Sequence, residues 1–163
     1  MSKLSTLQEL MVEELRDTYS AETQIAAALP KMAAKATSPQ LKAAFEKHLA
    51  ETQNQVARLE KVFQHLGESP EGNMCEATEG LVKEADELIG EDVDPQVLDA
   101  GLIASAQKVE HYEIASYGTL CTWATQLGQH EILALLKESL NEEEMTDKNL
   151  SMLAESGINQ KAQ

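Results

Sequence analysis

Cysteine, glycine, proline and aromatic residues are all scarce in this chain of 163 residues. It contains 8 glycines, 4 prolines and 2 cysteines, and aromatic side chains make up 4% of it. So few helix breakers, together with abundant Ala, Leu, Glu, Gln and Lys, favour α-helix throughout. Two cysteines do not make a disulfide framework and suit a reducing compartment. We expect Cys121 to be a buried small hydrophobe and Cys75 to be an exposed thiol.

Basic residues are also in short supply. The chain has 13 Lys and Arg residues against 28 Asp and Glu residues, a net charge of −15. Such a surface repels phosphate groups, so neither nucleic acid nor a membrane is an expected partner. No apolar run is long enough to span a bilayer, and residues 1–5 lack the apolar core of a signal peptide. We therefore expect a cytoplasmic protein, folded as a single domain over residues 1–163.

Apolar residues recur at steps of three and four in four long segments, which predicts four long helices. They cover roughly residues 5–36, 39–66, 95–127 and 129–155. A capping box of Ser5 with Gln8 is expected at the start of the first helix. Between the second and third helices, turn residues surround a short amphipathic piece at 75–89. The economical all-α arrangement is a four-helix bundle of two antiparallel hairpins, joined by a long crossover that carries a short fifth helix.

Carboxylates interrupt the apolar face of every long helix. Glu110 and Glu113 lie three apart on one face, where helical residues stack turn upon turn. One glutamate in each helix also lies thirteen or fourteen residues from its own hairpin turn, or roughly 20 Å at the helical rise. If the hairpins lie head to tail, all four meet near the middle of the bundle. These four are Glu22, Glu51, Glu113 and Glu143.

Buried carboxylates need a compensating positive charge, because removing a charge from water costs several kcal/mol. No Lys or Arg falls on the inward stripes at this level; Arg16 and Arg58 occupy flanking positions. Iron or manganese accepts carboxylate and imidazole ligands, so the pattern predicts a dinuclear metal centre. The alternative is a metal-free polar core held by hydrogen bonds.

Further residues complete the predicted site. Glu110 and Asp147 are either ligands or solvated residues at a helix edge, and His48 is either a ligand or a partner that orients Glu51. Tyr19 and Gln55 are expected to hydrogen-bond the ligands. The predicted metal-binding set is Glu22, His48, Glu51, Glu110, Glu113, Glu143 and Asp147.

Several motifs resemble the ferritin-like superfamily and, within it, the YciE/YciF-type bacterial stress proteins. They are Asp17-x-Tyr19-x-Ala21-Glu22, His48-x-x-Glu51-Thr52, Arg58-Leu59-Glu60 and Glu142-Glu143-x-x-x-Asp147. The resemblance covers nearly the whole chain. It implies a ferritin-like bundle, a homodimer, a rubrerythrin-like dinuclear centre, and iron–oxygen or peroxide chemistry.

The chain departs from the superfamily pattern in its second helix. The usual motif is Glu-x-x-His, whereas Asn54 follows Glu51 by three positions and His48 precedes it. The first functional hypothesis is therefore an iron- or peroxide-handling oxidoreductase of the stress response, with a carboxylate-rich site. The second is a non-enzymatic stress-response scaffold with a metal-free or degenerate site, and a storage cage ranks third.

Overall fold

A capping box starts the first long helix. In the computed structural model, which describes residues 4–163, α1 spans Leu7–Lys35. The hydroxyl of Thr6 accepts a hydrogen bond from the Glu9 backbone N–H (3.1 Å), and the Glu9 carboxylate accepts one from the Thr6 backbone N–H (3.0 Å). The predicted pair of Ser5 with Gln8 is therefore wrong by one residue. A carboxylate is a stronger acceptor than an amide, and Glu9 also accepts from the backbone and hydroxyl of Ser5.

The second and third long helices begin at prolines that follow a capping side chain. Helix α2 spans Pro39–Leu66, with Ser38 at its N-cap, and α4 spans Pro95–Gln126, with Asp94 at its N-cap. Proline suits the first helical position because the N–H that it lacks has no partner there. Helix α2 stops at Gly67, whose φ of 67° is a left-handed conformation that glycine adopts without strain.

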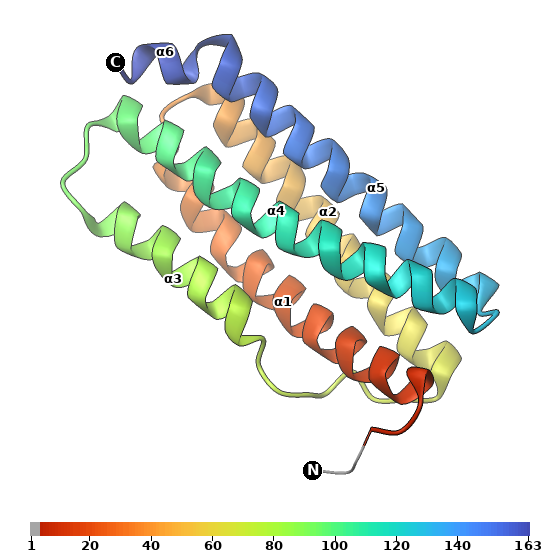
Figure 1. Ribbon diagram of the computed structural model, residues 1–163. Helices are drawn as coiled ribbons and strands as arrows, with labels where there is room; N and C mark the ends of the chain where they lie inside the picture. Colours follow the sequence, from red (N-terminus) through yellow and green to blue (C-terminus); the bar gives the residue numbers. More distant parts are fainter. Residues whose placement is uncertain (1–3) are drawn as a thin grey trace.

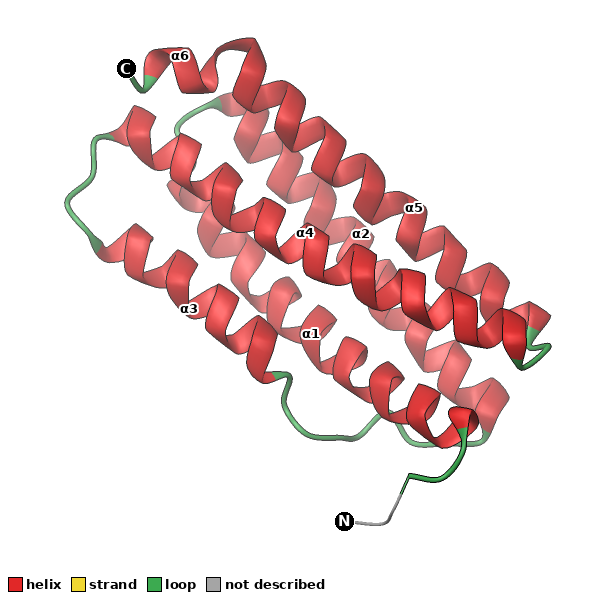
Figure 2. Cartoon of the chain, viewed as in Figure 1, coloured by secondary structure: helices red, strands yellow, loops and turns green. Residues whose placement is uncertain are grey.

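The remaining helices follow the prediction closely. Helix α3 spans Glu76–Gly90 within the crossover, and α5 spans His130–Leu153. After α5 the chain forms a wider turn, η1, over Ala154–Ile158, and then a last turn, α6, over Asn159–Lys161. The described part of the chain consists of helices and loops, without a strand (Figure 2). None of the helices within residues 4–163 is long and apolar enough to cross a membrane.

The two hairpins lie head to tail, as predicted. In Figure 1 the α1–α2 turn and the α4–α5 turn lie at opposite ends of the bundle. Helix α1 packs against α2 and α4, and α5 packs against α2 and α4. Helix α3 lies along the outside of the bundle, against α1 and α4. This is the ferritin-like arrangement that the sequence predicts, and it brings the midpoints of all four long helices together.

Two apolar clusters fill the ends of the bundle and leave a polar layer between them. Along α4, for example, Leu102 and Ile103 belong to one cluster, and Leu120 and Ala124 belong to the other. Glu110 and Glu113 lie between these pairs. The same order holds on α1, where Leu15 and Ile25, one from each cluster, flank the buried Glu22. The fold therefore places the carboxylates inside the protein, with packed hydrocarbon on both sides. The buried polar residues of this middle layer are Glu22, His48, Thr52, Gln55, Glu110, Glu113 and Glu143.

Candidate metal centre

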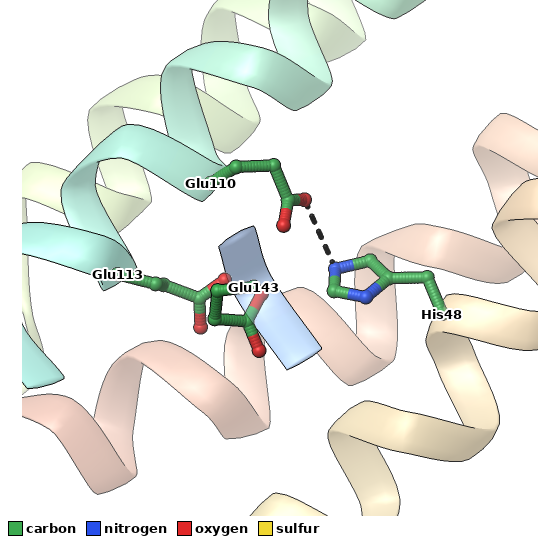
Figure 3. Close-up of side chains that lie close together, drawn as sticks. All are labelled: His48, Glu110, Glu113 and Glu143. Carbon is green, nitrogen blue, oxygen red and sulfur yellow. Dashed lines mark ion pairs between the residues drawn. The ribbon is translucent and has the colours of Figure 1, made fainter. Parts of the chain in front are cut away.

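Three helices contribute a compact group of four buried side chains. His48 comes from α2, Glu110 and Glu113 from α4, and Glu143 from α5, and they point toward one another in Figure 3. One nitrogen or oxygen from each lies within 4.8 Å of the others. His48 Nε2 lies 3.1 Å from Glu110 Oε1. The spacing of three between Glu110 and Glu113 brings both carboxylates to the group from consecutive turns of one helix.

Helix α1 adds a fifth buried polar residue. Glu22 is 0% exposed, and its Oε1 accepts a hydrogen bond from the Tyr117 hydroxyl. The carboxyl groups of Glu22 and Glu113 lie close enough to share a proton, and so do those of Glu110 and Glu143. The group therefore contains two carboxyl pairs beside one imidazole. All four long helices contribute to it.

A chain of hydrogen bonds supports Glu143 from α2. The Gln55 amide donates to Glu143 Oε1 and, at 3.0 Å, to Glu142 Oε2. Both Arg58 guanidinium NH₂ groups donate to the Glu142 carboxylate at 2.7 Å, which is a two-point contact. Arg58 also donates to Ser139 at 3.1 Å. Gln55 therefore contacts a predicted ligand, while the Arg58 charge is neutralised by Glu142 and does not contact the buried group.

Two of the predicted ligands lie at the edge of the layer. Glu51 is partly exposed, with Oε1 paired to Lys47, whereas its Oε2 is buried without a hydrogen-bond partner. Asp147 Oδ1 accepts from the Gln107 amide at 3.0 Å and lies 3.3 Å from His111 Nε2. Neither belongs to the compact group of four. Glu51 has one buried oxygen without a hydrogen-bond partner, and Asp147 is held by neighbours outside the group.

The tyrosine that contacts the carboxylates is a different one from that predicted. The hydroxyl of Tyr19 donates to exposed Glu60 at 3.3 Å, and its ring packs edge-on against Phe63. Tyr117, fully buried, takes the expected role by donating to Glu22. It follows Glu113 by four positions, so the helical repeat could have placed it on the same face. Its ring also packs in the apolar core.

Burial controls the protonation of the carboxyl groups. Desolvation, with a further contribution from nearby carboxylates, raises the pKa of Glu22 and of Glu110 to about 8 each. The same causes raise the pKa of Glu113 and of Glu143 well above the usual range. Desolvation, followed by the Glu22 charge, also raises the pKa of the Tyr117 hydroxyl, which stays protonated as a donor. Without a cation, these carboxyl groups hold protons at neutral pH.

The donor atoms fit divalent metal ions. Glu22 Oε2, Glu110 Oε2, Glu143 Oε2 and both oxygens of Glu113 are buried without a hydrogen-bond partner, and so is His48 Nδ1. Buried polar atoms are normally paired, so these oxygens require either a proton shared within a carboxyl pair or a cation. Carboxylate oxygens with one imidazole suit iron or manganese. The residues present therefore fit the predicted group.

The structure corrects the environment predicted for Cys75. Its side chain is 1% exposed, and its sulfur lies 3.1 Å from the Tyr112 hydroxyl and 3.4 Å from Thr78 Oγ1. Tyr112 in turn donates to Asp17 at 2.5 Å. The loop before α3 is therefore fastened to α1 and α4. Only the packing of the crossover against the bundle buries this thiol, which is why sequence pattern could not reveal it.

Fold and site together define a ferritin-like helical bundle with a buried cluster of carboxylates. Residues 6–163 match the domain of unknown function DUF892. Protein YciF of Escherichia coli (strain K12) is 46% identical over 161 residues, which are 98% of this chain and 97% of that protein. The chain therefore belongs to the DUF892 family, to which its motifs already pointed.

Solved structures agree with this assignment. The crystal structure of the E. coli stress protein YciF is 45% identical, with a TM-score of 0.92 over 96% of this chain and 99% of that one. YcfI from Rhodopseudomonas palustris is 49% identical, with a TM-score of 0.88 over 91% of this chain and 95% of that one. A ferritin-like, diiron-carboxylate protein from Bacillus anthracis str. Ames is 19% identical, with a TM-score of 0.72 over 92% and 99%. This last likeness supports the fold alone.

Proposed function

We propose that this protein acts in the stress response as a ferritin-like oxidoreductase that holds two iron or manganese ions among its buried carboxylates. The observation that carries the proposal is the set of buried, unpaired oxygens of Glu110, Glu113 and Glu143, which are grouped with His48. A further buried, unpaired oxygen of Glu22 on α1 adds to this set. In the described part of the chain, no Lys or Arg forms an ion pair with any of these four glutamates. The stress role is carried over from the E. coli relative, which is named a stress protein.

Charge balance favours two ions over one. The four fully buried glutamates carry four negative charges when ionised, the amount that two divalent cations neutralise. A single divalent ion would neutralise only two of these charges, so the other two glutamates would have to keep protons at the raised pKa that burial gives them. The half-buried Glu51 offers a fifth carboxylate at the edge, in place of the usual Glu-x-x-His arrangement. The proposed site is therefore richer in carboxylate than the superfamily pattern.

When bound, two such ions would supply two electrons, enough to convert dioxygen and two protons into hydrogen peroxide, or hydrogen peroxide and two protons into two water molecules. The protein residues prepare this site. Tyr117 fixes Glu22 through one oxygen and leaves the other free. Gln55 does the same for Glu143. The apolar clusters above and below exclude water, which strengthens the attraction between carboxylates and cations.

Metal binding by matched variants tests the proposal. Protein purified without chelator and loaded with Fe²⁺ under anaerobic conditions should bind about two ions per chain, as charge balance requires. Glu113→Gln should bind fewer, because Glu113 has two free buried oxygens. Glu144→Gln, an exposed neighbour of Glu143 on the same helix, is the control and should bind as the parent does. Fewer than about one ion per parent chain would sink the proposal.

The scaffold function has its own support in the structure. Each of the four glutamates has a raised pKa, and the two carboxyl pairs are close enough to share protons. A protonated, metal-free polar layer is thus a physically possible state of the folded protein. If it is the working state, a chelator should leave the melting temperature of freshly isolated protein unchanged. A fall in melting temperature on chelation would count against the scaffold.

A further inference from the structure

A small cavity lies beside the buried carboxylates, beneath the crossover helix. Its volume is about 20 Å³, and its walls come from α1, α3 and α4, with His48 of α2 completing them. Most of the lining is hydrocarbon, including Ile25, Leu81, Val82 and Val109. A cavity needs about 10–15 Å³ to hold one water, so this one admits a single small molecule.

The two sides of this cavity differ in exposure and chemistry. On the inner side are His48 and Glu110, which are 3% and 1% exposed and belong to the compact group of four. On the outer side are Leu81 and Val82 of α3 and Val109 of α4, all half-buried. The cavity therefore extends from partly exposed hydrocarbon to the imidazole and carboxylate of the candidate metal centre.

We propose that this cavity is the entry passage of dioxygen, a small apolar molecule, and that hydrogen peroxide does not enter through it. Water and hydrogen peroxide lose hydrogen bonds on entering an apolar space, at a cost of several kcal/mol without replacement partners. Apart from His48 and Glu110 at the inner side, Ser105 is the polar residue of the lining. Dioxygen has no hydrogen bonds to lose, and dry apolar cavities take up apolar gases. The inference rests on the proposed metal centre and assigns a route to one of its two oxidants, dioxygen.

The crossover helix makes the passage testable without altering a ligand, because α3 carries none of the predicted metal-binding residues. Ala85 of α3 is 6% exposed and lines the cavity, so Ala85→Leu should fill it. Ala77→Leu makes the same chemical change on the exposed side of α3 and is the matched control. Val109→Ala removes two methyl groups from the outer side and should widen the passage.

The first experiment uses metal-free protein under oxygen pressure. Dissolved dioxygen is paramagnetic and apolar gases concentrate in dry cavities. It should therefore speed the NMR relaxation of the methyl groups of Ile25 and Leu29, both 3% exposed and in the cavity lining, about threefold or more over that of equally buried methyls elsewhere. Leu59 and Leu120, in the apolar cluster at the other end, serve as the reference methyls. Ala85→Leu should remove the difference and Ala77→Leu should keep it. Equal relaxation rates for the cavity methyls and the reference methyls would overturn the proposed passage.

The second experiment measures oxidation of Fe²⁺-loaded protein in a stopped-flow instrument, with dioxygen or hydrogen peroxide as the oxidant. Ala85→Leu should slow oxidation by dioxygen about tenfold, a barrier increase of about 1.4 kcal/mol, while bound iron stays at the parent level. Oxidation by hydrogen peroxide should stay within about twofold of the parent, because a tenfold effect would mark a shared route. The iron in Val109→Ala should be oxidised by dioxygen at least as fast as in the parent. This variant provides a second test of the passage if Ala85→Leu folds poorly.

The outcomes separate this inference from the metal centre itself. Equal slowing of both oxidants, or no slowing with either while iron is bound, would overturn dioxygen entry and leave the metal centre standing. A parent protein that binds no iron would overturn the metal centre, and with it any oxidant route.

Discussion

Replacing Glu22 by Gln should stabilise the metal-free protein and destabilise the metal-loaded one relative to the parent. Glu22 is fully buried, and its folded-state pKa is about 8, against 4.5 for the ordinary group. At pH 7 the unfolded chain has this carboxyl ionised, whereas the folded chain holds it protonated. Folding therefore takes up a proton, which costs roughly 3 kcal/mol at about 1.4 kcal/mol for each pH unit above 4.5. Glutamine needs no proton, and its carbonyl can still accept from Tyr117.

The sign follows from proton linkage. Because the folded state binds more protons than the unfolded state between the two pKa values, stability falls as pH rises from about 4.5 to about 8. In the metal-free protein, the gain in unfolding free energy of Glu22→Gln over the parent should thus be near zero at about pH 4.5 and close to 3 kcal/mol at about pH 7. Metal reverses the comparison once it is well above its Kd: an ion at a thousand times its Kd adds about 4.1 kcal/mol to the parent, which exceeds the gain of about 3 kcal/mol in the variant, and adds little to the variant.

Urea denaturation followed by circular dichroism measures this directly. With a slope of about 1–3 kcal/mol per molar urea, a 3 kcal/mol gain moves the midpoint by about 1 M or more in the presence of chelator. Glu144→Gln, an exposed residue, should show no shift at either pH. If the difference between Glu22→Gln and the parent were the same at both pH values, the buried carboxyl would not be taking up a proton, and the reasoning would be refuted.

Three further predictions come from the same contacts. Tyr117→Phe removes the hydroxyl that contacts Glu22 and should cost about 1–3 kcal/mol in metal-loaded protein, measured by urea denaturation; an unchanged midpoint would contradict the contact. Tyr112→Phe leaves Asp17 without its donor and loosens the crossover, so Cys75 should react faster with a thiol reagent, and an unchanged rate would argue against this anchor. The parent protein in chelator should lose melting temperature steadily from about pH 5 to about pH 8, whereas a flat profile would mean that the buried carboxyl groups are ionised in the folded state.

The sequence alone determined the helices and the level of the carboxylates. Apolar residues at steps of three and four, with Pro39 and Pro95 at helix starts and Gly67 at a helix end, specify the elements through local chemistry. Counting from each hairpin turn then places one glutamate of each long helix near the middle of the bundle. These inferences hold because helical rise and periodicity are properties of the backbone, which do not depend on the neighbouring helices.

Only the tertiary structure decided which side chains meet within that layer. A helix face is about a hundred degrees wide, so periodicity cannot tell whether a residue points to the centre or to the edge. Packing placed Glu110 in the compact group, left Glu51 and Asp147 at the edge, and turned Tyr19 toward Glu60. The burial of Cys75 and the cavity under α3 likewise depend on how the crossover lies against the bundle. Contacts between helices distant in sequence arise from side-chain packing, which leaves no periodic signal in the chain.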